Sequence, residues 1–307
     1  MEKQKLTKAL REGYRIAALF ARPDLDFRSG QAYAYFEQDP LTGDKRGVIS
    51  QQTADQIAKQ VGYTQAELQS LPAGANRGMS CGHPLGFAQL HHGEVVLDLG
   101  CGCGIDCFLA SGLVGHAGRV VGIDLTQEMI ERAKTLQAIF VENGGANNIA
   151  FVMGDAENVP LDTGAADVVI ANGCITLSCD KQRVFREIMR VLRRGGRLAI
   201  ADIACLRELP NHARESAADL LGCTAGISHV NTYTQLLREV GFINIQITPL
   251  PGYVQGLKNV KAGLYDQVAA SLPHGETLAD YVSAIGISAL KADEQKKFPT
   301  PCSETPL

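Results

Sequence analysis

Three glycines stand close together in the run Asp98-Leu99-Gly100-Cys101-Gly102-Cys103-Gly104. The run follows an apolar stretch typical of a strand and precedes a stretch typical of a helix. Glycine permits a tight turn there and lets a ligand approach the backbone closely. A dinucleotide-binding loop, G-x-G-x-x-G, would place its third glycine at position 105, which is Ile105. The loop therefore indicates a ligand without a pyrophosphate.

Acidic residues accompany this loop at the ends of three expected strands. Asp98 lies at the end of the first, Asp124 ends the second and Asp155 follows the third. Open α/β sheets bind ligands at this carboxyl edge, where an acid after the second strand can accept hydrogen bonds from ribose hydroxyls. Asp155 could reach an adenine amino group. A single aspartate is more often a helix cap, but three in register indicate a nucleoside site.

The surrounding sequence alternates between short apolar strands and helices. The expected strands are 95–99, 120–123, 149–153, 167–171 and 197–203, and the expected helices are near 105–114, 127–143 and 181–192. This alternation implies parallel crossover connections and helices on both faces of a sheet. The predicted fold class is therefore α/β, with a Rossmann-like doubly wound sheet. We expect Gly195-Gly196 to end the third helix, since glycine tolerates a left-handed cap.

Three parts of the chain are expected. Residues 1–62 are predicted to be an N-terminal helical cap segment, with helices near 6–20 and 52–61. Residues 63–250 form the core, in which Thr64 and Glu67 have capping-box spacing, a late helix opens at 232 and a strand covers 242–247. Residues 251–307 form a short C-terminal extension with a closing strand, 281–290, and a loose tail.

The run from Val95 to Asp202 resembles the core of class I methyltransferases. The resemblance implies S-adenosylmethionine as cofactor, with the loop glycines at its methionine end, Asp124 at its ribose, and Asp155 with the Ala156 amide at its adenine. The cofactor-binding residues implied in this way are Asp98, Gly100, Gly102, Gly104, Asp124, Leu125, Asp155, Ala156 and Asn172.

A narrower resemblance, to the arsenite methyltransferase family, covers most of residues 60–250. It is carried by Gly62-Tyr63-Thr64, Pro72-Ala73-Gly74-Ala75-Asn76, Cys81-Gly82-His83-Pro84, Leu177 to Arg186 and Gly222-Cys223-Thr224-Ala225-Gly226. It implies methyl transfer to trivalent arsenic, a small-molecule substrate, with a thiol reductant as partner. Trivalent arsenic is soft, and thiolates are the soft ligands that would hold it.

The family uses three cysteines, at positions matching Cys81, residue 173 and Cys223. Here position 173 is Gly173 and a cysteine follows at Cys174. Either Cys174 supplies the third thiolate, or two thiolates suffice, or the substrate has changed. If the strand continues through residue 174, Cys174 would face away from the ligand, whereas an irregular strand end could redirect it. The candidate catalytic residues are Cys81, Cys174 and Cys223, and we favour two thiolates, which suits methylarsenite.

Composition excludes other classes of protein. With 29 basic and 33 acidic residues the net charge is -4, which provides no basic field for nucleic acid. The apolar runs are too short to cross a membrane, and the first residues do not resemble a signal peptide. The odd number of cysteines, nine, indicates reduced thiols and a cytoplasmic location. Cys101, Cys103 and Cys107 match no zinc or iron–sulfur spacing, so we expect no metal site and three small buried side chains.

Three alternatives remain open. The first is a methyltransferase that acts on an organic thiol or another small metabolite, with Cys81 and Cys223 only structural. The second is a protein that binds a metalloid without catalysis. The third, a nicotinamide-dependent oxidoreductase, is disfavoured by Ile105 in the glycine loop.

Overall fold

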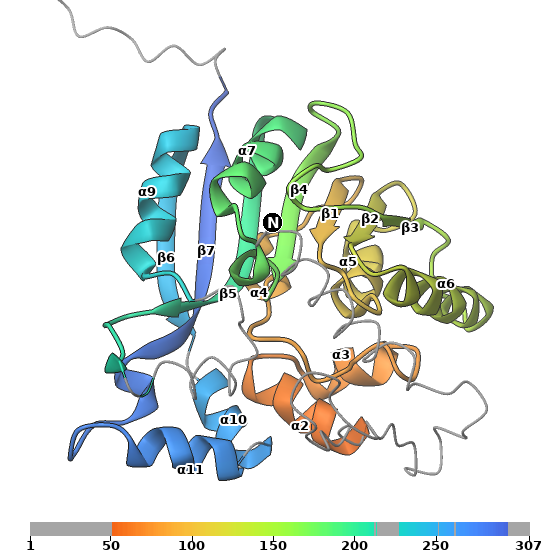
Figure 1. Cartoon of the computed structure of the whole chain (residues 1–307). Coiled ribbons are helices and arrows are strands. Elements are labelled where there is room, and N and C mark those ends of the chain that lie inside the picture. The colour runs from red at the N-terminus through yellow and green to blue at the C-terminus, as the bar shows by residue number, and fades with distance from the viewer. Residues whose placement is uncertain (1–50, 212, 214–226, 251, 261, 294–307) are drawn as a thin grey trace, which may run out of the picture.

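The computed structural model describes residues 51–211, 213, 227–250, 252–260 and 262–293. Its described part contains a seven-stranded sheet in the order β3-β2-β1-β4-β5-β7-β6 (Figure 1). The strands are β1 Val95–Leu99, β2 Arg119–Asp124, β3 Ile149–Met153, β4 Ala166–Asn172, β5 Leu192–Cys205, β6 Phe242–Leu250 and β7 Val282–Lys291. Strands β1 to β5 pair in parallel, while β7 pairs antiparallel to both β5 and β6. The predicted doubly wound α/β fold is confirmed.

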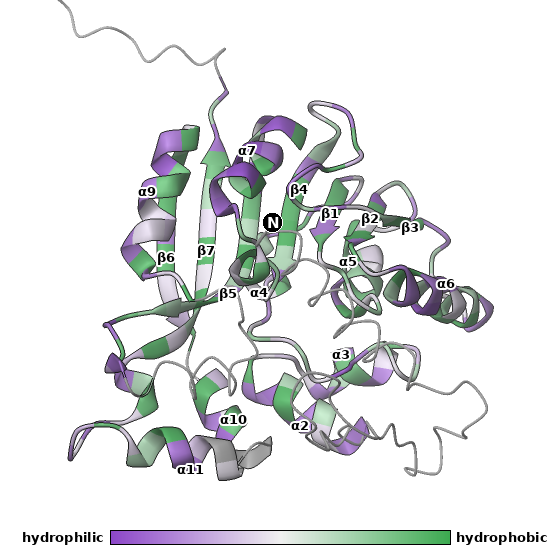
Figure 2. Cartoon of the chain, viewed as in Figure 1, coloured by the Kyte–Doolittle hydropathy of each residue, from purple (hydrophilic) through white to green (hydrophobic). Residues whose placement is uncertain are grey.

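Helices cover both faces of the sheet, as the apolar strands require. They are α4 Leu85–Ala88, α5 Ile105–Val114, α6 Gln127–Glu142, α7 Lys181–Val191 and α9 Val230–Val240. Alternate residues of a strand enter different cores: Leu97 packs with α7 and α9, whereas Val96 packs with α5 and α6. Figure 2 shows the hydrophobic central strands between helices that carry hydrophilic residues. The strands are thus buried on both faces, as expected for parallel pairing.

Two predictions about helix ends are wrong. The third crossover helix, α7, ends at Val191, one residue from the predicted end, but Gly195-Gly196 do not cap it, because Leu192 already takes an extended conformation and pairs with Ala166 of β4. The two glycines lie inside β5, where the pairing with β4 shifts register. Helix α9 begins at Val230 instead of residue 232, and the His229 side chain caps it by accepting a hydrogen bond from the Asn231 amide.

A layer of helices lies at the carboxyl edge of the parallel strands, at the bottom of Figure 1. It consists of α2 Gln51–Gln60, α3 Gln65–Ser70, α10 Tyr253–Val260 and α11 Ala262–Ala270. The capping box at Thr64 and Glu67 is confirmed. Helices α10 and α11 were not predicted. At Gly252, before α10, a Cβ atom would collide with the Gln60 carbonyl of α2, so the close approach of these elements needs glycine. The first fifty residues and the tail after 293 lie outside the described residues.

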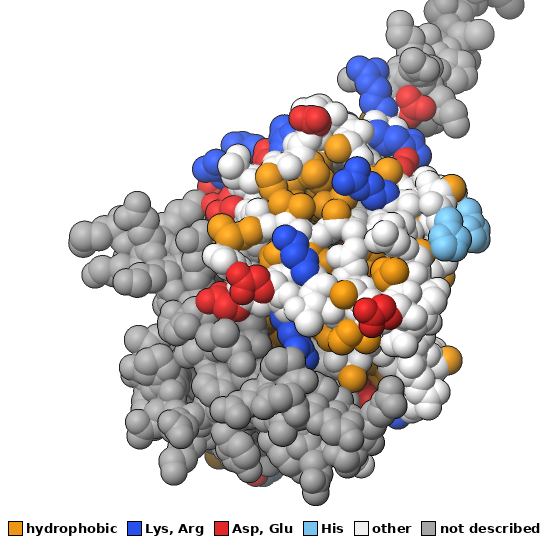
Figure 3. Space-filling view, turned by 90° about the vertical axis from the view of Figure 1, so that its right-hand side faces the viewer, with side chains coloured by type: hydrophobic (Ala, Val, Ile, Leu, Met, Phe, Trp, Pro, Cys, Tyr) orange, Lys and Arg blue, Asp and Glu red, His pale blue; other side chains and the backbone are white. Residues whose placement is uncertain are grey.

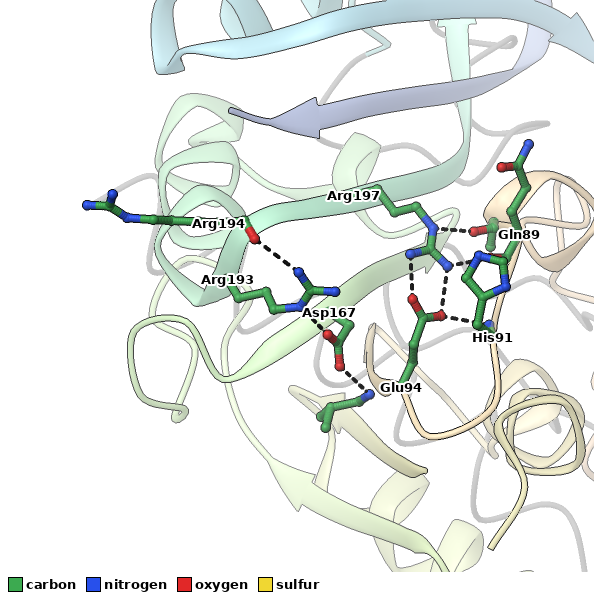
Figure 4. Close-up of polar contacts among 9 residues, drawn as sticks. Gln89, His91, Glu94, Asp167, Arg193, Arg194 and Arg197 are labelled. Atoms are coloured by element: carbon green, nitrogen blue, oxygen red, sulfur yellow. Dashed lines mark hydrogen bonds and ion pairs between the residues drawn. The ribbon is translucent and has the colours of Figure 1, made fainter. Parts of the chain in front are cut away.

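Ion pairs fix the opposite, amino edge of the sheet, and the one between Arg197 and Glu94 is largely buried (Figure 4). Arg197 of β5 binds both carboxylate oxygens of Glu94, at 2.7 and 2.8 Å, and donates to the carbonyls of Ala88 and Gln89. Although burial alone would raise it, the Arg197 hydrogen bonds lower the pKa of Glu94. Arg197 therefore ties the connection between α4 and β1 to the centre of the sheet.

The face that carries the edge strand β3 and helix α6 is viewed directly in Figure 3. On its described part, hydrophobic, acidic and basic side chains are interspersed, so no field of one sign covers it. Two residues of β3, Val152 and Met153, expose 36% and 53% of their area. This mixed surface agrees with the small net charge of the sequence.

Candidate active site

A cavity with about 1050 Å³ of empty space, part of it open to solvent, lies at the carboxyl edge of the sheet. It is bounded by the ends of β1, β2 and β4, at the point where the order of the strands reverses. Ligands of open α/β folds bind at this switch point. Eight of the predicted site residues line it: Gly100, Gly102, Asp124, Leu125, Asp155, Ala156, Asn172 and Cys174.

The glycine loop forms one wall of the cavity. The amides of Gly100 and Cys101 both donate to the Ile123 carbonyl, at 2.8 and 3.0 Å, which holds the loop against β2. Gly102 has φ 52°, and a Cβ atom there would meet nothing within 4 Å. Gly104 instead precedes α5, where a Cβ would lie 2.8 Å from the Phe151 ring, and it does not line the cavity. The loop therefore offers its backbone to a ligand at Gly100 and Gly102.

Asp124, the predicted ribose ligand, lines the cavity at the end of β2. Its two oxygens accept hydrogen bonds from the amides of Gly102, at 2.9 Å, and Thr126, at 2.8 Å. Burial raises the pKa of Asp124 in spite of these hydrogen bonds. The carboxylate lines the cavity, where it could accept a hydrogen bond from a ligand hydroxyl. The carboxylate thus joins the glycine loop to the cavity.

The third acid lines the cavity and the first does not. Asp155 follows β3, and its Oδ1 accepts a hydrogen bond from the Glu157 amide at 2.9 Å. Asp98 is 2% exposed and lies outside the cavity lining. The Cys107 thiol donates to Asp98 at 3.2 Å, and burial, together with the charge of Asp106, raises the pKa of Asp98 well above its ordinary value. Asp98 therefore supports the structure from within the core.

Strand β4 ends before Cys174, so the argument from a continuing strand does not apply. The last residue of β4 is Asn172, and Gly173 turns the chain with φ 69°. Cys174 lines the cavity, where a Cβ added at Gly100 would lie 2.8 Å from its sulfur. Burial, with the nearby carboxylate of Asp124, raises the pKa of the Cys174 thiol well above its ordinary value. This thiol thus lies against the glycine loop and is held in its protonated form.

The side chain of Cys81 lies next to Gly173. Its sulfur lies 3.7 Å from the point where a Cβ of residue 173 would stand, although Cys81 is only 1% exposed. The third candidate, Cys223, lies outside the described residues. Of the loop cysteines, Cys101 and Cys103 are buried, and burial raises their pKa to about 12 and about 11. Both thiols are therefore protonated at neutral pH, in line with their predicted structural role.

Comparison with known proteins finds methyltransferases. The model of a family described as "Methyltransferase domain" matches residues 90–241. An arsenite methyltransferase of Halobacterium salinarum is 39% identical over 203 residues, which cover 66% of this chain and 51% of that protein. The human arsenite methyltransferase is 35% identical over 152 residues, 48% of this chain and 40% of that protein. The chain is thus similar to S-adenosylmethionine-dependent methyltransferases of class I and, among them, to arsenite methyltransferases.

A solved structure shows the same similarity. An arsenic(III) S-adenosylmethionine methyltransferase from Chlamydomonas reinhardtii is 28% identical, with a TM-score of 0.50 over 80% of this chain and 74% of that one. The present chain spans about half the length of the curated arsenite methyltransferases that it matches, or less.

The residues at the cavity fit S-adenosylmethionine, the cofactor of these methyltransferases. Gly100 and Gly102 line the cavity, a Cβ at Gly102 would meet nothing within 4 Å, and Asp124 and Asp155 lie at the ends of neighbouring strands. Apart from Gly173, eight further lining residues were not predicted as site residues: Met79, Ile123, Thr126, Gly154, Glu157, Leu177, Ser178 and Cys179. Three of them follow β4 in the short turn after Cys174, which belongs in part to a segment that carries the family resemblance but was given no role at the site. Glu157 accepts a hydrogen bond from the Ser178 hydroxyl at 2.9 Å and so joins the two walls.

A buried acid, Asp202 near the end of β5, positions the turn after β4. Its oxygens accept hydrogen bonds from the amides of Thr176 and Ile203, both at 2.8 Å, and from the Tyr233 hydroxyl at 3.3 Å. Burial raises the pKa of Asp202 to about 7. Lys181 holds the same turn by donating to the carbonyls of Thr176 and Ser178. Asp202 and Lys181 therefore hold the turn that follows Cys174 in place from the side away from the cavity.

None of the helices in the described ranges combines the length and the apolar character that a membrane span needs. Within the same ranges no group of three or more histidine, cysteine or acidic residues could hold a metal ion.

Proposed function

We propose that this chain transfers a methyl group from S-adenosylmethionine to trivalent arsenic held by cysteine thiolates. The proposal depends on one observation. The Cys81 sulfur lies next to position 173, where the family has another cysteine, beside the cavity lined by the glycine loop and Asp124. Soft thiolates bind a soft metalloid there, next to the place where the cofactor would lie. The similarity to arsenite methyltransferases supports the same substrate.

In this proposal the protein positions its two ligands and needs no general base. When bound, the cofactor supplies a methyl group activated on a sulfonium, and trivalent arsenic carries the lone pair that accepts it. Gly100 and Gly102 hold the methionine end, Asp124 the ribose, and Asp155 with the Ala156 amide the adenine. Cys81 and Cys223 hold the metalloid. Correct placement of two reactants alone can supply several kcal/mol of catalysis, about 7–11 in model reactions.

Cys174 lies toward the glycine loop rather than toward Cys81, and this supports two thiolates over three. Two thiolates suit methylarsenite, which already carries one carbon on arsenic. A thiol reductant would keep the cysteines and the metalloid reduced, and the cytoplasmic location predicted from the sequence is part of the same proposal.

Methyl transfer from labelled S-adenosylmethionine tests the proposal, with arsenite, methylarsenite, selenite and simple thiols offered side by side. Cys81→Ser and Cys223→Ser should each lower turnover on arsenicals at least about a hundredfold, since serine replaces a soft thiolate with a hard hydroxyl. Cys174→Ser should leave turnover on arsenicals nearly unchanged if two thiolates suffice. Cys205→Ser serves as a control, because Cys205 is partly buried and lies outside the cavity lining. Full turnover in both Cys81→Ser and Cys223→Ser would refute the arsenic substrate.

The glycine at position 173 favours one second candidate. Without the family's third cysteine, the same site could methylate an organic thiol or another small metabolite. In that case one of the simple thiols would be the preferred acceptor in the same experiment, and the serine variants would keep their activity.

A further inference from the structure

At the carboxyl end of β4 the Asn172 side chain binds the segment that carries Cys81. Its Oδ1 accepts hydrogen bonds from the amides of Cys81 and Gly82, at 3.0 and 3.3 Å. The Cys81 thiol donates to the same oxygen at 3.4 Å. Its Nδ2 donates to the Gly82 carbonyl at 2.8 Å. One side-chain amide thus holds both the backbone and the sulfur of the candidate metalloid ligand.

A buried pair of residues holds the nitrogen side of this amide. Nδ2 of Asn172 also donates to Asp106 of α5 at 3.1 Å and to the Tyr63 hydroxyl at 3.0 Å. Tyr63 in turn donates to Asp106 at 2.7 Å, and both residues are 2% exposed. The side-chain amide of Asn172 can point only one way. Two backbone amides donate to its oxygen, and a carbonyl and a carboxylate accept from its nitrogen. Its orientation is therefore fixed without any ligand.

The segment that carries Cys81 has little room to move sideways. A Cβ atom at Gly82 would lie 2.6 Å from the Ala201 Cβ of β5, so only glycine fits between Asn172 and that strand. Cys81 itself is packed in a hydrophobic cluster with Val254 of α10 and Tyr281. Its sulfur consequently stays beside position 173, at the acceptor side of the cavity.

We propose that Asn172 is a positioning residue that fixes Cys81 for binding of a thiophilic metalloid, with Tyr63 and Asp106 holding its amide. This assignment rests on the proposed function. Asn172 was predicted as a cofactor ligand, yet its amide is committed to protein groups on both sides. It therefore acts through Cys81, although the residue also lines the cavity.

The nearly isosteric variant Asn172→Asp tests this role, because it replaces the Nδ2 donor with an oxygen that faces Asp106 and the Gly82 carbonyl. Binding of phenylarsine oxide is followed by the ultraviolet absorption of arsenic–thiolate bonds, and binding of S-adenosylhomocysteine by calorimetry. We expect the affinity for the arsenical to fall about tenfold or more and the affinity for S-adenosylhomocysteine to change less than about threefold. An equal fall of both affinities would make Asn172 a cofactor ligand and overturn the proposal, as would an unchanged arsenical affinity.

Asn148→Asp is a matched control. Asn148 is also half-buried, donates to the Gly115 carbonyl at 2.8 Å and accepts from the Ser111 hydroxyl at 2.6 Å, at the opposite edge of the sheet. The same change of amide to carboxylate should leave arsenical affinity as in the wild type. In a Cys81→Ser background, Asn172→Asp should cause no further loss, since the residue it positions is already gone. A full additional loss there would mean that Asn172 acts elsewhere.

A second readout does not depend on arsenic. Alkylation of Cys81 by iodoacetamide, followed by peptide mass spectrometry, should be at least about tenfold faster in Asn172→Asp than in the wild type. The reason is that the hydrogen bond from Nδ2 to the Gly82 carbonyl is replaced by repulsion between two oxygens. Asn148→Asp should alkylate at the wild-type rate. If the wild-type protein binds and methylates no arsenical, the proposed function fails while this measurement still decides the positioning role. Equal alkylation rates in Asn172→Asp and wild type would overturn it.

Discussion

Restoring a cysteine at position 173 is the most direct perturbation of the acceptor side. The Cβ of Gly173→Cys would stand 3.7 Å from the Cys81 sulfur and 3.9 Å from the Met79 carbonyl, both ordinary contacts, so the side chain fits. The backbone is less tolerant, since φ at this glycine is 69°. A side chain in the left-handed region costs about 1–2 kcal/mol, so thermal unfolding should occur several degrees lower.

The new thiol should compensate for this strain only where three sulfurs can bind. A thiol held beside the metalloid acts at an effective concentration in the mM range. We therefore expect arsenite affinity to rise about tenfold or more, whereas methylarsenite, which needs two sulfurs, should change less than about threefold.

Gly173→Ser separates the effect of backbone strain from that of the new arsenic ligand. It places a side chain at the same left-handed φ but has no thiol. Affinities for both arsenicals are measured by the ultraviolet absorption of the arsenic–thiolate bond, and stability by thermal denaturation. Tighter arsenite binding in both variants, or in neither, would refute the reasoning that position 173 is the site of a third ligand.

Three further predictions address the rest of the fold. Asp124→Ala should weaken binding of S-adenosylhomocysteine by roughly 2–4 kcal/mol, about thirtyfold or more, as measured by calorimetry; wild-type affinity would exclude the ribose role. Arg197→Ala leaves the buried Glu94 unpaired and should lower the free energy of unfolding by about 3 kcal/mol in denaturant, whereas the half-exposed Arg193→Ala should cost less than about 1 kcal/mol. The Asp202 pKa is raised to about 7, so the folded state binds the extra proton and stability should fall as pH rises from 4 to 7, by at most about 1.4 kcal/mol per unit. Asp202→Asn should flatten that part of the pH profile, and an unchanged profile would contradict the raised pKa.

Local patterns were sufficient to predict the first half of the core. Helix α5 begins and ends at the predicted residues because Gly104 precedes it and Gly115 follows it, and the glycines act locally. The predicted glycine cap of α7 was wrong because Leu192 joins the sheet before the chain reaches Gly195, which is a tertiary effect. Helix α10 was missed for a similar reason, since it packs closely on α2 through Gly252.

The candidate site divides in the same way. Gly100, Gly102 and Asp124 could be predicted because a motif and the position after a strand mark them. The direction of Cys174 depends on the φ angle of Gly173, which spacing alone does not give. The hydrogen bonds of Asn172 join residues that are 66 to 109 positions apart in sequence, so no local pattern could indicate them.

The two sides of the cavity come from different parts of the chain, and this has an evolutionary consequence. In the proposed function, the loop after β1 and the end of β2 hold the cofactor, whereas Met79, Cys81 and Gly173 lie together on the acceptor side. A substitution such as the one at position 173 can thus alter which acceptor is selected while binding of S-adenosylmethionine is unchanged. Descendants of one ancestral enzyme could therefore diverge in substrate through single substitutions after β4. No intermediate variant would need to lose its ability to bind the methyl donor.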